Sequence, residues 1–191
     1  MKNKFLIISF LVCCQITGLL ADNLNITSRN ISVDKKSEIT IFKNEVLIKD
    51  SKNNTIQSDY AEYNKKLNLI TLKKNVLAKD YKGNIFESNN AIYNEKLKLF
   101  KSIGETKITT NEGTSVITKN ITLDNQLNVV LSNEETVITD IQKNKILLNN
   151  FEYKAKDSIF KSVGKIKVID NLKNSYEFSQ IYIDEKNKEI I

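Results

Sequence analysis

Two pairs of adjacent carboxylates are the residues of this chain whose types and spacing best suit acid–base chemistry. Glu134 with Glu135, and Asp184 with Glu185, each place two acids side by side, and such pairs could in principle do acid–base work. Both pairs fall at expected bends or turns with charged neighbours, so a solvated surface is the favoured interpretation. A lyase of the β-solenoid type would also need a charged cluster in a cleft, and Arg29 is the sole arginine. The chain is therefore not expected to be an enzyme.

Histidine and cysteine usage narrows the chemistry further. The chain has no His, and its two cysteines, Cys13 and Cys14, lie within the first 21 residues. Cys–His nucleophile pairs, His general bases, zinc sites and the other usual transition-metal sites all need these residue types. We expect no catalytic residue, no cofactor-binding residue and no metal site in the remainder of the chain.

Residues 1–21 have the form of a secretory signal peptide. Lys2 and Lys4 make a basic start, "FLIISFLVCC" is an apolar stretch, and Ala21 is a plausible last residue before cleavage. Leu19 stands where a small residue is preferred, which leaves an uncleaved anchor as an alternative. No later run is apolar enough to span a membrane. We expect a signal peptide over 1–21 and a single soluble, exported domain over 22–191.

The charge balance does not favour nucleic acid as a partner. The whole chain carries a formal charge of +6, which falls to +4 when Lys2 and Lys4 leave with the signal peptide. The remaining lysines are scattered among acids, as in "NKKLN" and "NEKLK". A nucleic-acid face would show a basic stripe with interleaved aromatic residues. A solvated surface explains these lysines, and no nucleic-acid partner is expected.

A thirty-residue repeat organises the chain. The stretch "NEVLIKD" at 44–50 returns as "KNVLAKD" at 74–80, and a shift of thirty residues aligns the whole exported chain. Several aligned columns are entirely apolar, such as Ile48, Ala78 and Ile108. Another column is rich in Asp and Asn, which open turns by bonding to their own backbone. Because so many columns keep one register, we expect a protein built from equal stacked units.

Within each unit the pattern has the period of a β-strand. "SDYAEYN" and "NNAIYN" alternate apolar and polar residues, as a half-buried strand does. We predict a strand near 55–63, a tight turn near 64–66, a longer strand near 67–79 and a second turn near 81–84.

The longer strand is expected to bend in its middle rather than reverse. It is interrupted near 74–75, and the equivalent positions in other units include Gly104 and Gly164. Glycines inside a strand pattern are typical of a bulge or bend. Strands joined by tight turns pair antiparallel, so we expect an all-β protein: a long antiparallel sheet folded over on itself, with the apolar columns inside.

The end of the sequence predicts an unpaired edge. The chain stops at "YIDEKNKEII", in mid-unit and without a capping sequence. An exposed strand edge is normally a liability. We expect this edge to pair with another subunit, or the chain to be the first part of a longer protein.

The stretch "SDYAEYNKKLNLITLKKNVLAKD", an Ala-x-Tyr strand, an Asn-opened turn and a second apolar strand, resembles the OstA-like domain of lipopolysaccharide transport proteins. That family includes LptA, LptC and the periplasmic N-terminal domain of LptD, and the resemblance covers about residues 28–191. The C-terminal part looks most like the LptD domain, although that domain commonly carries cysteines that this chain lacks. The resemblance implies a V-shaped β-jellyroll with an apolar interior.

The resemblance also implies a function without catalysis. The chain would shield the lipid A acyl chains of lipopolysaccharide in its groove, in the periplasm and near the outer membrane. Its partners would be lipopolysaccharide, other Lpt-type jellyroll subunits paired edge strand to edge strand, and an outer-membrane barrel component. The candidate groove residues are the apolar columns: Ile48, Ile56, Ala61, Tyr63, Ala78, Phe86, Ala91, Tyr93, Ile108, Val116, Ile121, Leu123, Ile138, Ile146, Phe151, Tyr153, Val168 and Ile181.

Several alternatives stay open on the sequence alone. A stand-alone LptA-like bridge has about this length, and an LptC-like protein would keep its N-terminal anchor. A structural or adhesive β-repeat surface protein would show the same columns around a solid interior. Every inward column could be simple core rather than lipid contact.

Overall fold

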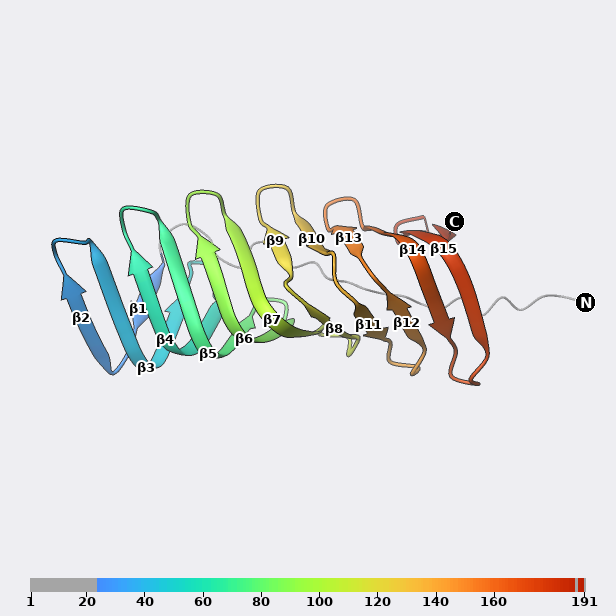
Figure 1. The fold of residues 1–191 in the computed structure, drawn as a ribbon, viewed down its shortest axis with the longest axis horizontal. Helices are drawn as coiled ribbons and strands as arrows, with labels where there is room; N and C mark the ends of the chain where they lie inside the picture. The colour runs from blue at the N-terminus through green and yellow to red at the C-terminus, as the bar shows by residue number, and fades with distance from the viewer. Residues whose placement is uncertain (1–23, 188, 191) are drawn as a thin grey trace, which may run out of the picture.

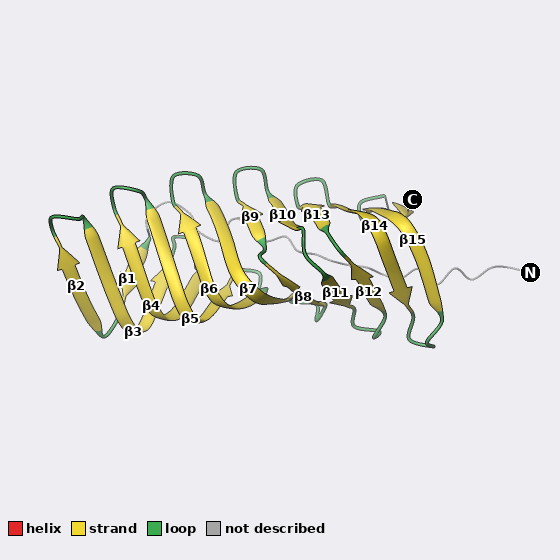
Figure 2. Ribbon diagram, viewed as in Figure 1, coloured by secondary structure: helices red, strands yellow, loops and turns green. Residues whose placement is uncertain are grey.

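The computed structural model describes residues 24–187 and 189–190, and the predicted signal peptide lies outside these residues. Within them every regular element is a strand, and all pairings are antiparallel (Figures 1 and 2). The strands are β1 (Asn25–Thr27), β2 (Asn30–Asp34), β3 (Ile39–Lys49), β4 (Thr55–Asn64), β5 (Leu69–Lys79), β6 (Ile85–Asn94), β7 (Leu99–Thr109), β8 (Ser115–Lys119), β9 (Thr122–Asp124), β10 (Val129–Ser132), β11 (Thr136–Thr139), β12 (Lys145–Leu148), β13 (Phe151–Lys154), β14 (Ile159–Ile169), β15 (Ser175–Asp184) and β16 (Glu189–Ile190).

The long strands bend in the middle, as the sequence predicts. On β5 the ladder with β6 skips between Lys73 and Val76, and the two residues between them, Lys74 and Asn75, have positive φ angles of 63° and 52°. Gly104 on β7 and the equivalent glycine of β14 have φ of 87° and 116°, a backbone conformation that favours glycine. Each bend turns the strand without ending its pairing, which is the work of a bulge.

In the middle units the bend breaks the strand outright. β8 and β9 are the two halves of one repeat strand, separated at Asn120 and Ile121. The next two repeat strands are interrupted at the equivalent place, one between β10 and β11 and the other between β12 and β13. The bend line is therefore least continuous over residues 119–151.

The two halves of the bent strands form the two walls of a V. The first wall runs β2-β3-β4-β5-β6-β7-β9-β10-β13-β14-β15-β16, and the second runs β1-β3-β4-β5-β6-β7-β8-β11-β12-β14-β15. The strands shared by both walls cross from one to the other at the bend. This confirms the predicted fold, an all-β V-shaped jellyroll built from units of about thirty residues.

Turns close each wall along its free rim. The first rim consists of the four-residue turns 35–38, 65–68, 95–98, 125–128 and 155–158, which follow one another along the upper edge in Figure 1. Backbone bonds connect neighbouring turns, as when the Glu95 N–H donates to the Asn68 carbonyl at 2.8 Å. The turn predicted near 64–66 thus lies at 65–68.

The second rim is held by an Asp–Asn brace at the ends of the second wall. Asp50 Oδ1 accepts the Asn54 N–H at 2.9 Å, and Asn54 Nδ2 donates to Asp50 Oδ2 at 2.7 Å. Asn54 Oδ1 then accepts the backbone N–H of Tyr81 in the next turn, also at 2.9 Å. Asn84 and Asn144 make the same bond to the turn that follows each of them. The second turn predicted near 81–84 is therefore present, beginning at Tyr81.

Two apolar columns lose their burial at the N-terminal edge, against expectation. Ile31 and Val33 stand thirty residues before the predicted groove residues Ala61 and Tyr63, yet they are 57% and 61% exposed. Both lie on β2, which pairs only with β3 among the described strands. Tyr176 is exposed on β15 for the same reason, since a column is covered only where a neighbouring unit lies over it.

Candidate lipid-binding interior

The apolar columns of the two walls meet in one continuous core. Phe86 lies on the second-wall half of β6 and Phe100 on the first-wall half of β7. Their rings contact edge to face, with centroids 5.0 Å apart and an interplanar angle of 86°. Such contacts join the walls directly, so the space inside the V is filled by side chains.

The predicted groove residues occupy this interior. Seventeen of the eighteen are buried, from Ile48 in the first units to Ile181 near the last. Tyr63 is half-buried against the core, and its hydroxyl donates to Glu95 Oε2 at 3.0 Å. Burial, followed by the bond to the Glu95 carboxylate, raises the pKa of Tyr63. The predicted groove residues thus face the interior, and their contact with lipid stays a prediction.

Several inward positions lie outside the predicted groove residues, among them a whole column. Ile70, Phe100, Val130 and Phe160 are all buried and repeat at the same thirty-residue step. They lie on the first wall, directly after the four-residue turns. Alignment at that step would have found them, because these four members are apolar and Thr40, at the start of the column, is the exception.

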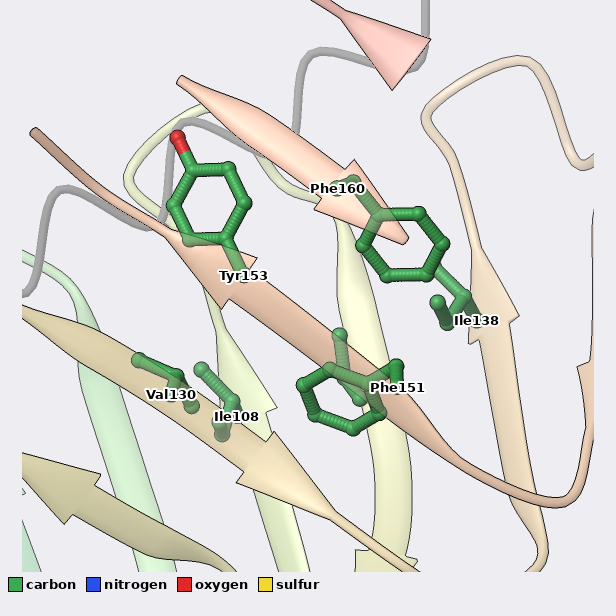
Figure 3. Close-up of a pocket in the computed structure, with 7 residues that line it drawn as sticks. Ile108, Val130, Ile138, Phe151, Tyr153 and Phe160 are labelled. Carbon is green, nitrogen blue, oxygen red and sulfur yellow. The ribbon is translucent and has the colours of Figure 1, made fainter. Parts of the chain in front are cut away.

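A small apolar cavity lies between the walls (Figure 3). It leaves about 10 Å³ for a guest, roughly the space of one water molecule. Its lining comes from both walls: Ile108, Val116 and Ile138 from the second, and Val130, Phe151, Tyr153 and Phe160 from the first. The cavity therefore falls in the part of the molecule where the bend breaks the strands.

Comparison with known proteins identifies the family. The family model described as lipopolysaccharide-assembly, LptC-related, matches residues 18–137. The chain belongs to the LptC-related lipopolysaccharide-assembly family. No curated protein matches it significantly. Among solved structures, LptH from Pseudomonas aeruginosa, an LptA-homologous periplasmic component of the lipopolysaccharide transport device, is 9% identical. That match covers 88% of this chain and 80% of LptH, with a TM-score of 0.23.

As a member of the LptC-related family, the chain is a periplasmic module of lipopolysaccharide transport. Family membership implies an association with lipopolysaccharide and with other subunits of the transport bridge. The closer assignment to the LptD N-terminal domain stays a prediction. The part of the chain that the structure describes contains no helix long and apolar enough to cross a membrane.

The vertex of this LptC-related V is polar around Ser102 and in the units that follow, whereas the equivalent positions of the first units hold the buried Phe42, Val46, Leu72 and Val76. A seam of buried hydroxyls follows the bend. Thr106 Oγ1 donates to Ser102 Oγ at 2.7 Å, and Ser102 Oγ also accepts the backbone N–H of Ile121 at 2.9 Å. Further along, Thr136 Oγ1 donates to Thr118 Oγ1 at 2.7 Å. The bond from Ile121 gives a partner to a backbone N–H at the bend, and the other two bonds pair the buried hydroxyls with one another.

The carboxylate pairs considered for acid–base chemistry make local hydrogen bonds. Glu134 Oε1 accepts a bond from Asn120 Nδ2 at 3.0 Å across the bend, and Glu135 is exposed. The backbone N–H of Asn187 is the largest influence holding the pKa of Asp184 below its usual value. Among the described residues, no group of acidic residues is arranged to hold a metal ion. We find no reacting constellation at either pair.

Proposed function

We propose that this chain shelters the acyl chains of lipopolysaccharide between its two walls and passes them along the V. The observation that supports this is the unbroken apolar interior, which runs through all five units. An apolar surface contacts hydrocarbon without demanding a particular sequence, and its removal from water contributes about 25 cal/mol per Å². A conduit for acyl chains needs such a lining along its full length.

The filled interior means that lipid enters by replacing contacts between the walls. Phe86 and Phe100 now cover each other, and an acyl chain lying between them would cover the same surfaces. Both states keep apolar groups out of water, so the exchange has a small net hydrophobic cost. In this proposal the side chains close the V when no lipid is present.

The two walls are least firmly joined over the middle units. There the crossing strands are interrupted at the bend, so the walls are joined by fewer continuous strands. The small cavity lies in the same segment, between Val116 and Ile138 on one wall and Val130 on the other. We therefore propose this segment as the place where the walls part first.

The ends of the V suit edge-to-edge pairing with other transport subunits. Ile31 and Val33 are exposed at one end, and Tyr176 and Phe178 at the other. All four lie on edge strands in the part of the chain that the structure describes, and a strand added at either edge would cover them. Pairing of this kind would join the apolar interiors of successive subunits.

Within the family, we propose a role like that of the LptD N-terminal domain, with an outer-membrane barrel component as partner. An LptA-like bridge is the nearest alternative, and it would use the same interior and edges. A structural β-repeat protein is the second candidate, because the interior is filled as such a protein requires.

Photocrosslinking in living cells tests the proposal. A photoreactive residue replacing Tyr93 or Ile121 should label lipopolysaccharide, because both side chains face the interior. Lys101 is the control, since it is exposed on the outer face of β7 next to the inward Phe100. Labelling from Lys101 with none from the two interior positions would refute the groove and favour a structural protein.

A further inference from the structure

The first rim carries a row of exposed leucines. Leu67, Leu97 and Leu127 are 58%, 53% and 69% exposed. Each is the third residue of its turn, in the hairpins β4–β5, β6–β7 and β9–β10, which succeed one another along the upper edge in Figure 1. Single exposed leucines are ordinary, but here one position of the repeat is exposed and apolar in three consecutive turns.

The row is held rigidly. The backbone N–H of each leucine donates to the Asx side chain that opens its turn, at 3.0, 2.9 and 2.9 Å. The turns are also bonded to one another, through Glu95 N–H to the Asn68 carbonyl at 2.8 Å and Asn125 N–H to the Lys98 carbonyl at 3.0 Å. The three leucines therefore share one backbone geometry and project from one connected rim.

Lysines flank the first two of these leucines. Lys65, Lys66, Lys96 and Lys98 lie in the first two of the three turns, and three of them are exposed. The one acid within these turns, Glu95, accepts a bond from the Tyr63 hydroxyl. Lysines that look scattered in the sequence are thus brought together by the fold, beside the apolar row.

The spacing of the row suits a flat apolar–polar boundary. Successive turns are two strands apart, or roughly 10 Å, so the row is about 20 Å long. That length exceeds a single lipid headgroup, and the leucines are separated rather than gathered into one patch. Separate apolar tips with lysines between them match the interface of a bilayer, where lysine stems lie along the apolar layer and their ammonium groups reach phosphate.

We propose that the first rim docks on the surface of a phospholipid bilayer that carries anionic headgroups, with Leu67, Leu97 and Leu127 inserted and the flanking lysines at the phosphates. Insertion leaves the leucine N–H groups paired, because the Asx side chains already accept them. A turn with unpaired N–H groups would lose solvation on entering the interface. This contact goes beyond lipid transport through the interior and does not depend on it.

The second rim provides the comparison within the same molecule. It also exposes apolar side chains, at Tyr81, Ile141 and Leu172. Tyr81 and Ile141 occupy the same position of their turns, but the polar Asn111 fills that position in the turn between them, and Leu172 lies one position later. The second rim therefore has no row of equivalent tips, and we expect it to stay in water.

A fluorescent label distinguishes the two rims. Gln126 is exposed beside Leu127 on the first rim, and Gln142 is exposed beside Ile141 on the second. Each is replaced by Cys in the full chain, with Cys13→Ser and Cys14→Ser to remove competing thiols, and labelled with an environment-sensitive dye. The probe is a phosphatidylcholine vesicle with about one-third phosphatidylglycerol. Since the label reports the depth of its own rim, attachment through the N-terminal segment would not mimic the result.

We expect the emission increase at position 126 to be at least about threefold larger than at 142, and to fall in high salt. Leu67→Ser combined with Leu97→Ser should weaken the response about tenfold or more, whereas Leu172→Ser should not change it.

Equal responses at 126 and 142, or none at 126, would overturn the proposal. An equal response on vesicles of phosphatidylcholine alone would show that docking does not need anionic headgroups, against the proposal. None of these outcomes bears on labelling from Tyr93 or Ile121, which tests the interior separately.

Discussion

Replacement of Ser102 by alanine tests the hydroxyl seam that joins the walls at the bend. Ser102 is buried, and its Oγ accepts both the Ile121 N–H at 2.9 Å and the Thr106 hydroxyl at 2.7 Å. In Ser102→Ala the Thr106 hydroxyl keeps the Gly104 carbonyl, 3.1 Å away. The Ile121 N–H loses its acceptor within the core. A buried donor left without a partner costs about 1–3 kcal/mol, and we expect the free energy of unfolding to fall by that amount.

Ser162 is the matched control, because it occupies the same column of the repeat. It is equally buried, but its Oγ donates to the Asn150 carbonyl, and in the described part of the chain no backbone N–H donates to it. Ser162→Ala should lose only an ordinary hydrogen bond, about 0.5–1.5 kcal/mol. Urea unfolding at constant slope gives both values.

Amide hydrogen exchange gives the sharper measurement. In Ser102→Ala the Ile121 amide should lose protection, while amides at the rims keep theirs. Unchanged protection at Ile121, or a smaller loss of stability than in Ser162→Ala, would show that the seam does not hold the bend as described.

Three further predictions address the core, the second rim and the pH dependence. Phe100→Ala should lower the free energy of unfolding by about 3–5 kcal/mol, measured by urea unfolding, since Phe100 is fully buried. Asn144→Ala should cost about 1–3 kcal/mol, because the buried side chain braces its own turn and accepts the Asn171 N–H; a cost below that of an exposed Asn→Ala change would contradict this. The bond from Asn174 is the main reason that the pKa of Asp170 lies below its usual 3.8. The folded state thus favours the carboxylate, and stability should fall as pH drops through and below 3.8, with Asp170→Asn reducing that dependence in unfolding midpoints measured against pH.

The fold was largely predictable because two independent periods agree in the sequence. Alternation within "SDYAEYN" fixes a strand with Ala61 and Tyr63 on one face. The thirty-residue step then places equivalent residues, such as Ala91 and Tyr93, in register on the next unit. Turn residues confirm both, since Asp and Asn recur where the strands end. Strand alternation, repeat spacing and turn positions each leave a pattern in the sequence, so they could be predicted from it.

Features that depend on neighbouring units were not predictable in the same way. Ile31 has the sequence signature of Ala61, yet it is exposed because no described strand lies over it. The lysines at 65, 66 and 96 look evenly spread along the chain, and only the stacking of turns gathers them on one rim. A filled core and an empty groove need the same apolar columns, which is why the state of the interior could not be inferred from them.

The distribution of polar and apolar contacts also indicates how such a V would open. Separating the apolar walls exchanges side-chain contacts for acyl contacts at little net cost. Opening at the bend would instead break buried hydrogen bonds such as those of Ser102 and Thr118, and each buried group left unpaired would be costly. The walls should therefore part at their rims and pivot about the bend, so lipid would enter past Leu127 and its neighbours. The rim that we propose to meet a bilayer is thus also a lip of the opening through which an acyl chain would reach the core.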